Sequence, residues 1–285
     1  MVDIFMKKLI LLLFTLNFLL TGCSSKFAYN NIDWLMYWYI DDYVELDNSQ
    51  KSLLDGHVEK WMHWHRQDEL SEYKSQLTTL YKQISSGPVS QAQWLAHFAL
   101  GKEHWVRFRD HVSPELASLA PHLTDKQVID LFAELNELNE ERIEKRKERT
   151  LEERLEKNIE DTQDNAKEFI GKLSPAQKTI IVTYADEFKS SFDLWMAYRQ
   201  RIQKNAFEML LNERHELDFP QRFLDLLSHP ERYQDDELVT ISQHNNQVYA
   251  AMLAELGQSL SAKQKKKALN ELQNLIDDIT DLQED

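Results

Sequence analysis

One short pattern recurs along the chain and constrains its fold more than any other feature. An apolar residue is followed by Ser, Thr or Asp, then by two further residues, then by Gln. The apolar residues that open the six copies are Leu46, Val89, Leu123, Leu173, Leu217 and Leu260, at intervals of 43, 34, 50, 44 and 43 residues. In a capping box, the Ser, Thr or Asp oxygen accepts from the backbone amide three residues on, while the Gln side chain bonds back to the N-cap amide. Each copy therefore predicts a helix start.

The boxes predict where helices begin, and glycines predict where some of them end. Thr150, with Glu153 three residues later, adds a box of the same kind. The predicted N-caps are Asp47, Ser90, Thr124, Thr150, Ser174, Asp218 and Ser261. Glycine is common just after the last turn of a helix. Gly87, Gly171 and Gly257 lie three or four residues before a cap, so we expect them to end the preceding helices.

The spacing of apolar residues predicts what lies between these ends. Residues 181–209 keep one apolar face, which predicts a helix of about seven turns. The apolar face shifts by about 100° between residues 54–65 and 70–84, so we expect a break near residues 66–69. No segment alternates for long with the period of two residues that marks a β-strand. The sequence predicts an all-α protein of about eight to ten helices, in units of roughly 43 residues, with no β-sheet.

Composition excludes several classes of protein. Six glycines and six prolines among 285 residues are too few for a collagen-like chain or for the many turns of an all-β fold. A single cysteine excludes a disulfide framework and a cysteine-rich metal site. With 48 acids against 33 bases, the formal charge is −15, so no nucleic-acid partner is expected.

The N-terminus predicts export and a lipid anchor. Residues 1–22 combine a positive start with a short apolar run, as in a secretory signal peptide. The Leu20-Thr21-Gly22-Cys23 end resembles the bacterial lipobox, in which the cysteine thiol is acylated and opens the mature chain. By analogy with lipoprotein sorting in Gram-negative envelopes, Ser24 favours the periplasmic face of the outer membrane. We expect a lipidated tether at 23–28, an N-terminal helical region at 29–149 and a C-terminal helical region at 150–285, which together can form one continuous domain.

The start of the mature chain also resembles a known family. The motifs that carry the resemblance are Tyr29-Asn30-Asn31, Asp33-Trp34-Leu35, Asp41-Asp42-Tyr43-Val44 and Trp64-His65-Arg66. They are similar to those of a family of uncharacterised helical lipoproteins of Gram-negative bacteria, over about residues 23–215. The capping boxes resemble, more weakly, those of small periplasmic helical stress chaperones. These resemblances imply a helical, lipid-anchored envelope protein, and neither brings a catalytic residue.

Residues 32–40 are apolar and aromatic on all sides of a helix. Such a helix is buried on every side or contacts something apolar. We expect a central core helix, because the acids Asp33, Asp41, Asp42 and Glu45 oppose an anionic membrane surface. The alternative is a segment at the membrane interface, since Trp and Tyr favour the headgroup boundary and the lipidated cysteine is near.

Five polar residues form a candidate site. Asp33, Asp41 and Asp42 lie close in sequence to His65 and Arg66. A buried imidazole or guanidinium needs a partner. We therefore expect His65 or Arg66 to pair with one of the three acids and to hold the N-terminal helix on the body. The alternative is acid–base chemistry by the same carboxylates.

The histidines do not predict a metal site. His97, His104 and His111 recur every seven residues, about 10 Å apart along one helix. Ligation of one ion from a helix requires a spacing of four residues, as in H-E-x-x-H, which is absent. We expect these histidines to flank the core, and we expect no metal and no cofactor.

The most charged stretch, residues 134–168, has 21 charged residues of 35 with both signs mixed. Pairs such as Glu141 and Lys145 are typical of solvent-exposed helices. We interpret the stretch as two solvated helices that bridge two subdomains. The alternative is a mobile arm that engages a partner through charge.

Two classes of function follow. The first is a non-enzymatic binding, chaperone-like or scaffold protein, anchored to the outer membrane, whose partner is another periplasmic or outer-membrane protein. The alternative is a hydrolase of envelope polymers that uses Asp41 or Asp42 with His65. A concave apolar groove would favour binding, whereas a pocket that gathers these residues would favour catalysis.

Overall fold

The computed structural model describes residues 22–284, with side chains from Lys26 onward. The signal peptide and the Cys23 thiol lie outside this description. Every regular element among the described residues is helical, which confirms the all-α prediction. The α-helices are α2 (Gly22–Asn30), α3 (Ile32–Ile40), α4 (Asn48–Trp64), α5 (Leu70–Ser86), α6 (Gln91–Leu119), α7 (Asp125–Lys147), α8 (Leu151–Ile170), α9 (Pro175–Ala185), α10 (Phe192–Asn212), α11 (Phe219–Ser228), α12 (Asp236–Gln258) and α13 (Ala262–Glu284). None of these helices is long and apolar enough to cross a membrane.

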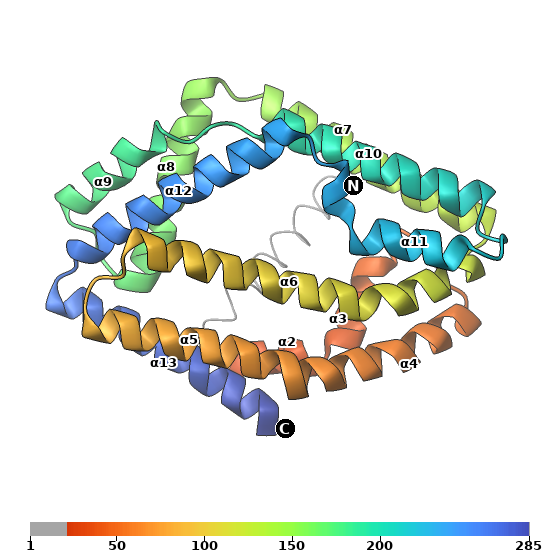
Figure 1. Ribbon diagram of the computed structural model, residues 1–285, viewed down its shortest axis with the longest axis horizontal. Coiled ribbons are helices and arrows are strands. Elements are labelled where there is room, and N and C mark those ends of the chain that lie inside the picture. Colours follow the sequence, from red (N-terminus) through yellow and green to blue (C-terminus); the bar gives the residue numbers. More distant parts are fainter. Residues whose placement is uncertain (1–21, 285) are drawn as a thin grey trace.

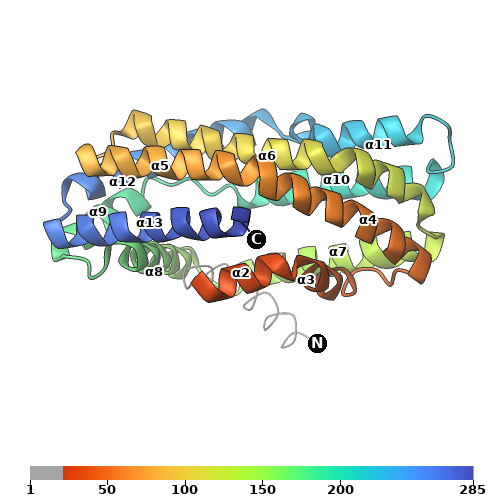
Figure 2. The ribbon, with the colours of Figure 1, turned by 90° about the horizontal axis from the view of Figure 1, so that it is seen from below.

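The helices build an elongated, flattened body (Figures 1 and 2). α4 and α5 run along one long edge, and α6 returns beside them. α7 and α10 pack together along the opposite edge. α13 packs on α5, and α12 and α11 pack on α6, so helices from the two halves of the sequence contact each other along the body.

Six of the seven predicted N-caps form capping boxes. Both reciprocal bonds are present at Asp47, Ser90, Thr124, Thr150, Ser174 and Ser261. The prediction for Asp218 is wrong, because its side chain caps no amide. Its backbone is helical, with ψ of 0°, whereas the N-caps of α4, α6, α7, α8 and α9 are extended, with ψ of 160° to 170°. The Asp218 carboxylate instead lies 3.1 Å from the Arg222 guanidinium.

Two of the three glycines that were predicted to end helices do so, and the third does not. Gly87 ends α5, and Gly171, with φ of 80°, ends α8. The prediction for Gly257 is wrong, because α12 continues through it to Gln258. The C-cap is Ser259, whose hydroxyl donates to the Leu256 carbonyl at 2.7 Å.

The long helix predicted at 181–209 is also wrong. α9 ends at Ala185 and α10 begins at Phe192, so six residues interrupt it. Asn245 of α12 bonds both backbone groups of Lys189, accepting from its N–H and donating to its carbonyl at 2.9 Å each. This contact between segments far apart in sequence holds residues 186–191 out of a helix, although the spacing of apolar residues predicts one.

The break expected near residues 66–69 is confirmed as a π-helix, His65–Glu69, between α4 and α5. A π-turn adds one residue to the helical ladder and rotates all that follows by roughly 100°. This rotation accounts for the shift of the apolar face between the two helices.

The central core helix predicted at 32–40 is wrong. α3 has no buried residue, and Trp34 is 61% exposed. The Tyr37 hydroxyl bonds to Asp55 and to the Lys51 carbonyl, at 2.6 and 3.0 Å. Ile32, Trp34 and Tyr39 are exposed, and the other apolar residues of α3 are half-buried, so the helix lies on the surface of the body.

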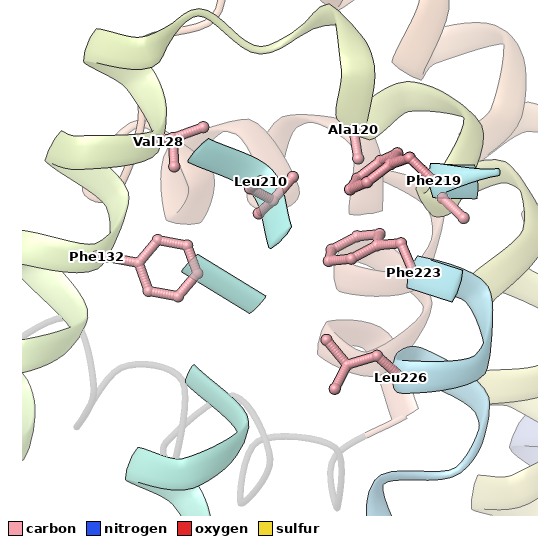
Figure 3. Packing of buried hydrophobic residues seen from close by; sticks show 8 residues of the cluster. Ala120, Val128, Phe132, Leu210, Phe219, Phe223 and Leu226 are labelled. Carbon is pink, nitrogen blue, oxygen red and sulfur yellow. The ribbon is translucent and has the colours of Figure 1, made fainter. Parts of the chain in front are cut away.

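Two clusters of packed apolar side chains stand out in the core. The larger joins α6, α7, α10 and α11 and is rich in phenylalanine (Figure 3). In it Phe219 and Phe223 stack with their centroids 5.2 Å apart. The smaller joins α9 and α12 through Ile181, Met252 and Leu256, with Leu173 before α9.

The capping boxes also bond to each other in pairs, which the sequence did not reveal. The Gln50 and Gln127 amides exchange two hydrogen bonds, of 2.9 and 2.7 Å. Gln177 and Gln264 do the same at 3.1 and 2.9 Å. Each of these four amides also donates to the carbonyl two residues before the partner's N-cap. One pair therefore locks the starts of α4 and α7, and the other locks the starts of α9 and α13.

Candidate functional site

The five polar residues singled out in the sequence do not form one site. The Tyr29 hydroxyl lies 3.0 Å from the His65 imidazole, and Arg66 donates to the Asn30 side chain at 2.8 Å. The predicted pairing with an acid is therefore wrong. The partners are neutral groups of α2, which lies against this part of the helix.

The three acids lie elsewhere. Asp33 is exposed, and Asp41 is 3.6 Å from the Lys51 ammonium. Burial, with the charges of Glu137 and Asp42, raises the pKa of Glu134, which places Asp42 near α7. The carboxylates thus point to different neighbours.

His65 and Arg66 still attach the N-terminal segment to the body. The Arg66 guanidinium lies 5.4 Å from the centre of the Tyr29 ring. Burial lowers the pKa of His65, so the imidazole is neutral and its Nδ1 can accept from the Tyr29 hydroxyl. The expected attachment exists, with different partners.

A buried polar network occupies the π-helix. Glu69 is 1% exposed and bonds to His104 and Arg107 at 2.7 and 2.8 Å. Burial alone would raise the pKa of Glu69, but the hydrogen bonds from Arg107 and His104 lower it overall. His97 and His104 are both buried beside the core, as expected from their spacing. The buried carboxylate of Glu69 thus fixes the π-helix against α6, with the Arg107 side chain partly exposed.

No group of three His, Cys, Asp or Glu residues suited to a metal ion occurs in residues 22–284. π-helices are frequent at functional sites. Here the Glu69 carboxylate has no room for a substrate, and its hydrogen bonds are satisfied within the protein.

The structure does contain a ligand-sized groove, which the sequence did not predict. Its volume is about 860 Å³. One wall is the end of α7 and the length of α8, and the other comprises α9, the start of α10 and the middle of α12. We call this feature the basic groove.

The base and rim of the basic groove are apolar. Ile181 and Met252, which belong to the smaller core cluster, are buried at its base. Phe188, Trp195 and Tyr249 line it and remain exposed to solvent. Large aromatic side chains left exposed around a concavity are typical of a binding surface.

The charges of the basic groove oppose those of the whole chain. Its cations are Lys145, Arg146, Arg149, Arg154, Lys157 and Lys189. Asp161 is the only acid in its lining. Lys145 pairs with Glu141, and Lys157 with Asp161 and Glu160. In a chain of net charge −15, such a concentration of positive charge is a local exception.

The remaining four cations have no acidic partner within 4.0 Å among the described residues. Arg146 lies 4.4 Å from the centre of the Phe192 ring and donates to the Ser190 hydroxyl at 2.6 Å. Burial and the nearby charge of Arg154 lower the pKa of Arg146. The charges of Arg146 and Arg154 therefore repel each other, Asp193 offsets only part of this repulsion, and an anion would relieve the rest.

A second set of cations continues this surface. Arg142 and Arg199 each lie 5.7 Å from the centre of the Trp195 ring. Burial and the charge of Arg142 lower the pKa of Arg199. The five cations between residues 145 and 157 belong to the stretch that we interpreted as two solvated helices. The sequence therefore indicated the charges but did not indicate that they line one groove.

The fold and the groove define an all-α protein with a site of ligand size. The chain belongs to DUF6279, a family of unknown function whose model matches residues 42–238. No curated protein and no solved structure matches the chain. The family match includes the α7–α10 part of the basic groove.

Proposed function

We propose that the protein is a non-enzymatic binding protein of the cell envelope. The observation that carries this proposal is the basic groove, which combines cations, exposed aromatic side chains and an apolar base. Such a composition suits binding of a ligand or partner. The hydrolase alternative needs Asp41 or Asp42 beside His65, whereas His65 bonds to Tyr29 and Asp41 lies near Lys51.

The proposal includes a lipid tether at Cys23, which rests on the lipobox and on the resemblance to Gram-negative lipoproteins. α2, which contains this cysteine, and α3, which follows it, carry Phe27, Ile32, Trp34 and Tyr39 exposed to solvent. Trp and Tyr favour the boundary between lipid and water. With Ser24 after the cysteine, we place the protein on the periplasmic face of the outer membrane.

α2 and α3 lie along the same face of the flattened body as α8 (Figure 2). The bonds of Tyr29 and Asn30 to His65 and Arg66 hold α2 to that body. In this arrangement the α8 wall of the basic groove is on the side of the tether. The protein would act as a chaperone-like or scaffold module for a component of the outer membrane or periplasm.

Cross-linking inside cells tests the binding function. A photoreactive amino acid replaces Leu151, which lines the basic groove and is 76% exposed, and in a matched control it replaces the fully exposed Leu217. We expect specific adducts from position 151 and none from position 217. Absence of adducts at position 151, or the same adducts at both positions, would contradict the proposal.

The tether is tested separately. Mass spectrometry of the mature wild-type chain should show an acylated N-terminal Cys23, and Cys23→Ser should leave the protein unacylated. A wild-type chain that begins elsewhere without a lipid would remove the anchor from the proposal.

A further inference from the structure

We propose that the basic groove binds an amphiphile with a phosphate head group and an apolar chain. This inference rests on the proposed binding function and names its ligand class. Three features carry it: the unpaired cations, the apolar base and the size of the groove.

The cations favour a head group with more than one negative charge. Arg146, Arg149, Arg154 and Lys189 all line the groove, and no carboxylate of the described residues lies within 4.0 Å of their charged groups. A phosphate monoester carries a charge of about −1.5 to −2 at neutral pH, while a carboxylate carries a single one. Guanidinium groups also match phosphate oxygens with two parallel hydrogen bonds.

The apolar surface favours a chain attached to that head group. Phe188, Trp195 and Tyr249 line the groove and are exposed, whereas Ile181 and Met252, which also border it, are buried. A free inorganic phosphate would leave this surface exposed to water. An acyl or alkyl chain would cover it, at a gain of roughly 25 cal/mol for each Å² removed from water.

The groove has the size of a site for a single molecule. Sites for small ligands have volumes of about 300–1,000 Å³, and the basic groove has about 860 Å³. A stable protein partner usually covers about 800 Å² on each side. The groove instead reaches inward to the core cluster, which favours a slender chain over the flat contact of a folded partner.

The contact between Asn245 and Lys189 fixes part of the groove lining in place. Asn245 bonds both the N–H and the carbonyl of Lys189, which fixes the backbone at residues that line the groove. The same interruption between α9 and α10 supplies Phe188, Ser190 and Ser191 to the lining. The cation and the aromatic group are thus set side by side before any ligand binds.

Binding of dodecyl phosphate tests the inference. The full chain is purified in a non-ionic detergent, and its affinity is measured by calorimetry against dodecyl phosphate, dodecanol, dodecanoate and inorganic phosphate. The groove variant is Arg149→Gln with Lys189→Gln, since neither side chain has an ion-pair partner whose loss would disturb the fold. The control, Lys126→Gln with Lys204→Gln, removes the same charge from exposed positions outside the groove.

We expect dodecyl phosphate to bind more tightly than the three comparison molecules. The groove variant should bind it at least about tenfold more weakly, because it loses two charge-assisted contacts, and the control variant should bind it like the wild type. Equal affinity in the groove variant, or equal affinity for dodecanol or dodecanoate, would overturn the inference.

The two proposals can fail separately. If cross-links at position 151 capture a protein while dodecyl phosphate does not bind, the binding function stands and the phosphate amphiphile is wrong. If neither cross-links nor binding are found, both are wrong.

Discussion

The two ends of the body use the same device and differ in what surrounds it. At one end the Gln50–Gln127 pair lies beside the phenylalanine-rich cluster, in which Phe219 is fully buried. At the other end the Gln177–Gln264 pair lies beside the smaller cluster, whose Ile181 and Met252 also form the base of the basic groove. We call them the packed end and the groove end.

The difference shows how a repeated element can serve both stability and binding. At both ends, paired amides satisfy the N-cap groups and fix two helix starts together. Only the packed end adds stacked phenylalanines. The groove end instead keeps aromatic side chains exposed and cations unpaired. We infer that stability is concentrated at the packed end and binding at the groove end.

The largest effect should come from the two cores. Phe219→Ala removes a fully buried ring and should lower the free energy of unfolding by about 3–5 kcal/mol. Met252→Ala, at the base of the groove, should cost less, about 2–3 kcal/mol, because side chains that border the groove can move into the space left by the buried methionine. Urea unfolding measures both. An equal or larger loss at Met252 would contradict the assignment of stability to the packed end.

The amide pairs should have intermediate effects that are similar at the two ends. Gln177→Ala leaves the Ser174 amide and the Gln264 side chain without their partner, in a site where Gln177 is 0% exposed. We expect a loss of about 1–3 kcal/mol, and the same for Gln50→Ala. A double-mutant cycle of Gln177 with Gln264 should show coupling of at least about 0.5 kcal/mol. Additive losses would mean that the two amides do not act together.

The capping boxes provide a smaller test with an internal control. Ser174→Ala removes an N-cap and should cost about 0.5–2 kcal/mol. Asp218→Ala removes no cap, since Asp218 bonds to Arg222 on an exposed surface, and should cost less than about 0.5 kcal/mol. Melting curves of the two variants compare these losses of stability. Equal losses would show that the boxes do not stabilise helix starts.

The smallest effect should have the opposite sign. Arg154→Gln removes a charge that lowers the pKa of Arg146, so the free protein should gain stability, by less than about 0.5 kcal/mol. Added salt should stabilise the wild type more than the variant, because it screens the same repulsion. Thermal unfolding at two salt concentrations tests this, and a loss of stability would show that the cations are already balanced.

The sequence predicted those features of the fold that depend on neighbouring residues. The capping box at Thr124 and the break near Glu69 follow from patterns within a few turns of helix. The predictions were wrong where features outside the local sequence pattern determine whether a helix continues or is capped. Asn245 holds the chain out of the helix that periodicity predicts around Lys189, and the backbone of Asp218 is helical where a capping residue is extended.

The candidate site could not be found in the same way. The Arg146, Arg149 and Arg154 cations were visible in the sequence, but their shared surface depends on aromatic groups of α10 and α12. The aromatic residues of α3 fit burial and exposure equally well in sequence, and only the packing of the body leaves Trp34 exposed. The acids were proposed as partners of His65 because they are close to it in sequence. Closeness in sequence does not determine which helix packs beside His65.

The two reciprocal glutamine pairs also close two separate loops of the chain. They join residues 77 and 87 positions apart, and the two intervals, 50–127 and 177–264, do not overlap. Loop-closure entropy grows only with the logarithm of length, so both loops close at nearly the same entropic cost, to within roughly 0.2 kcal/mol. Each can form without the other. Residues 128–176 belong to neither loop, and they supply five of the six cations of the groove. The wall of the basic groove that carries these cations can therefore pack after the base of the groove, which lies within the second loop, has formed.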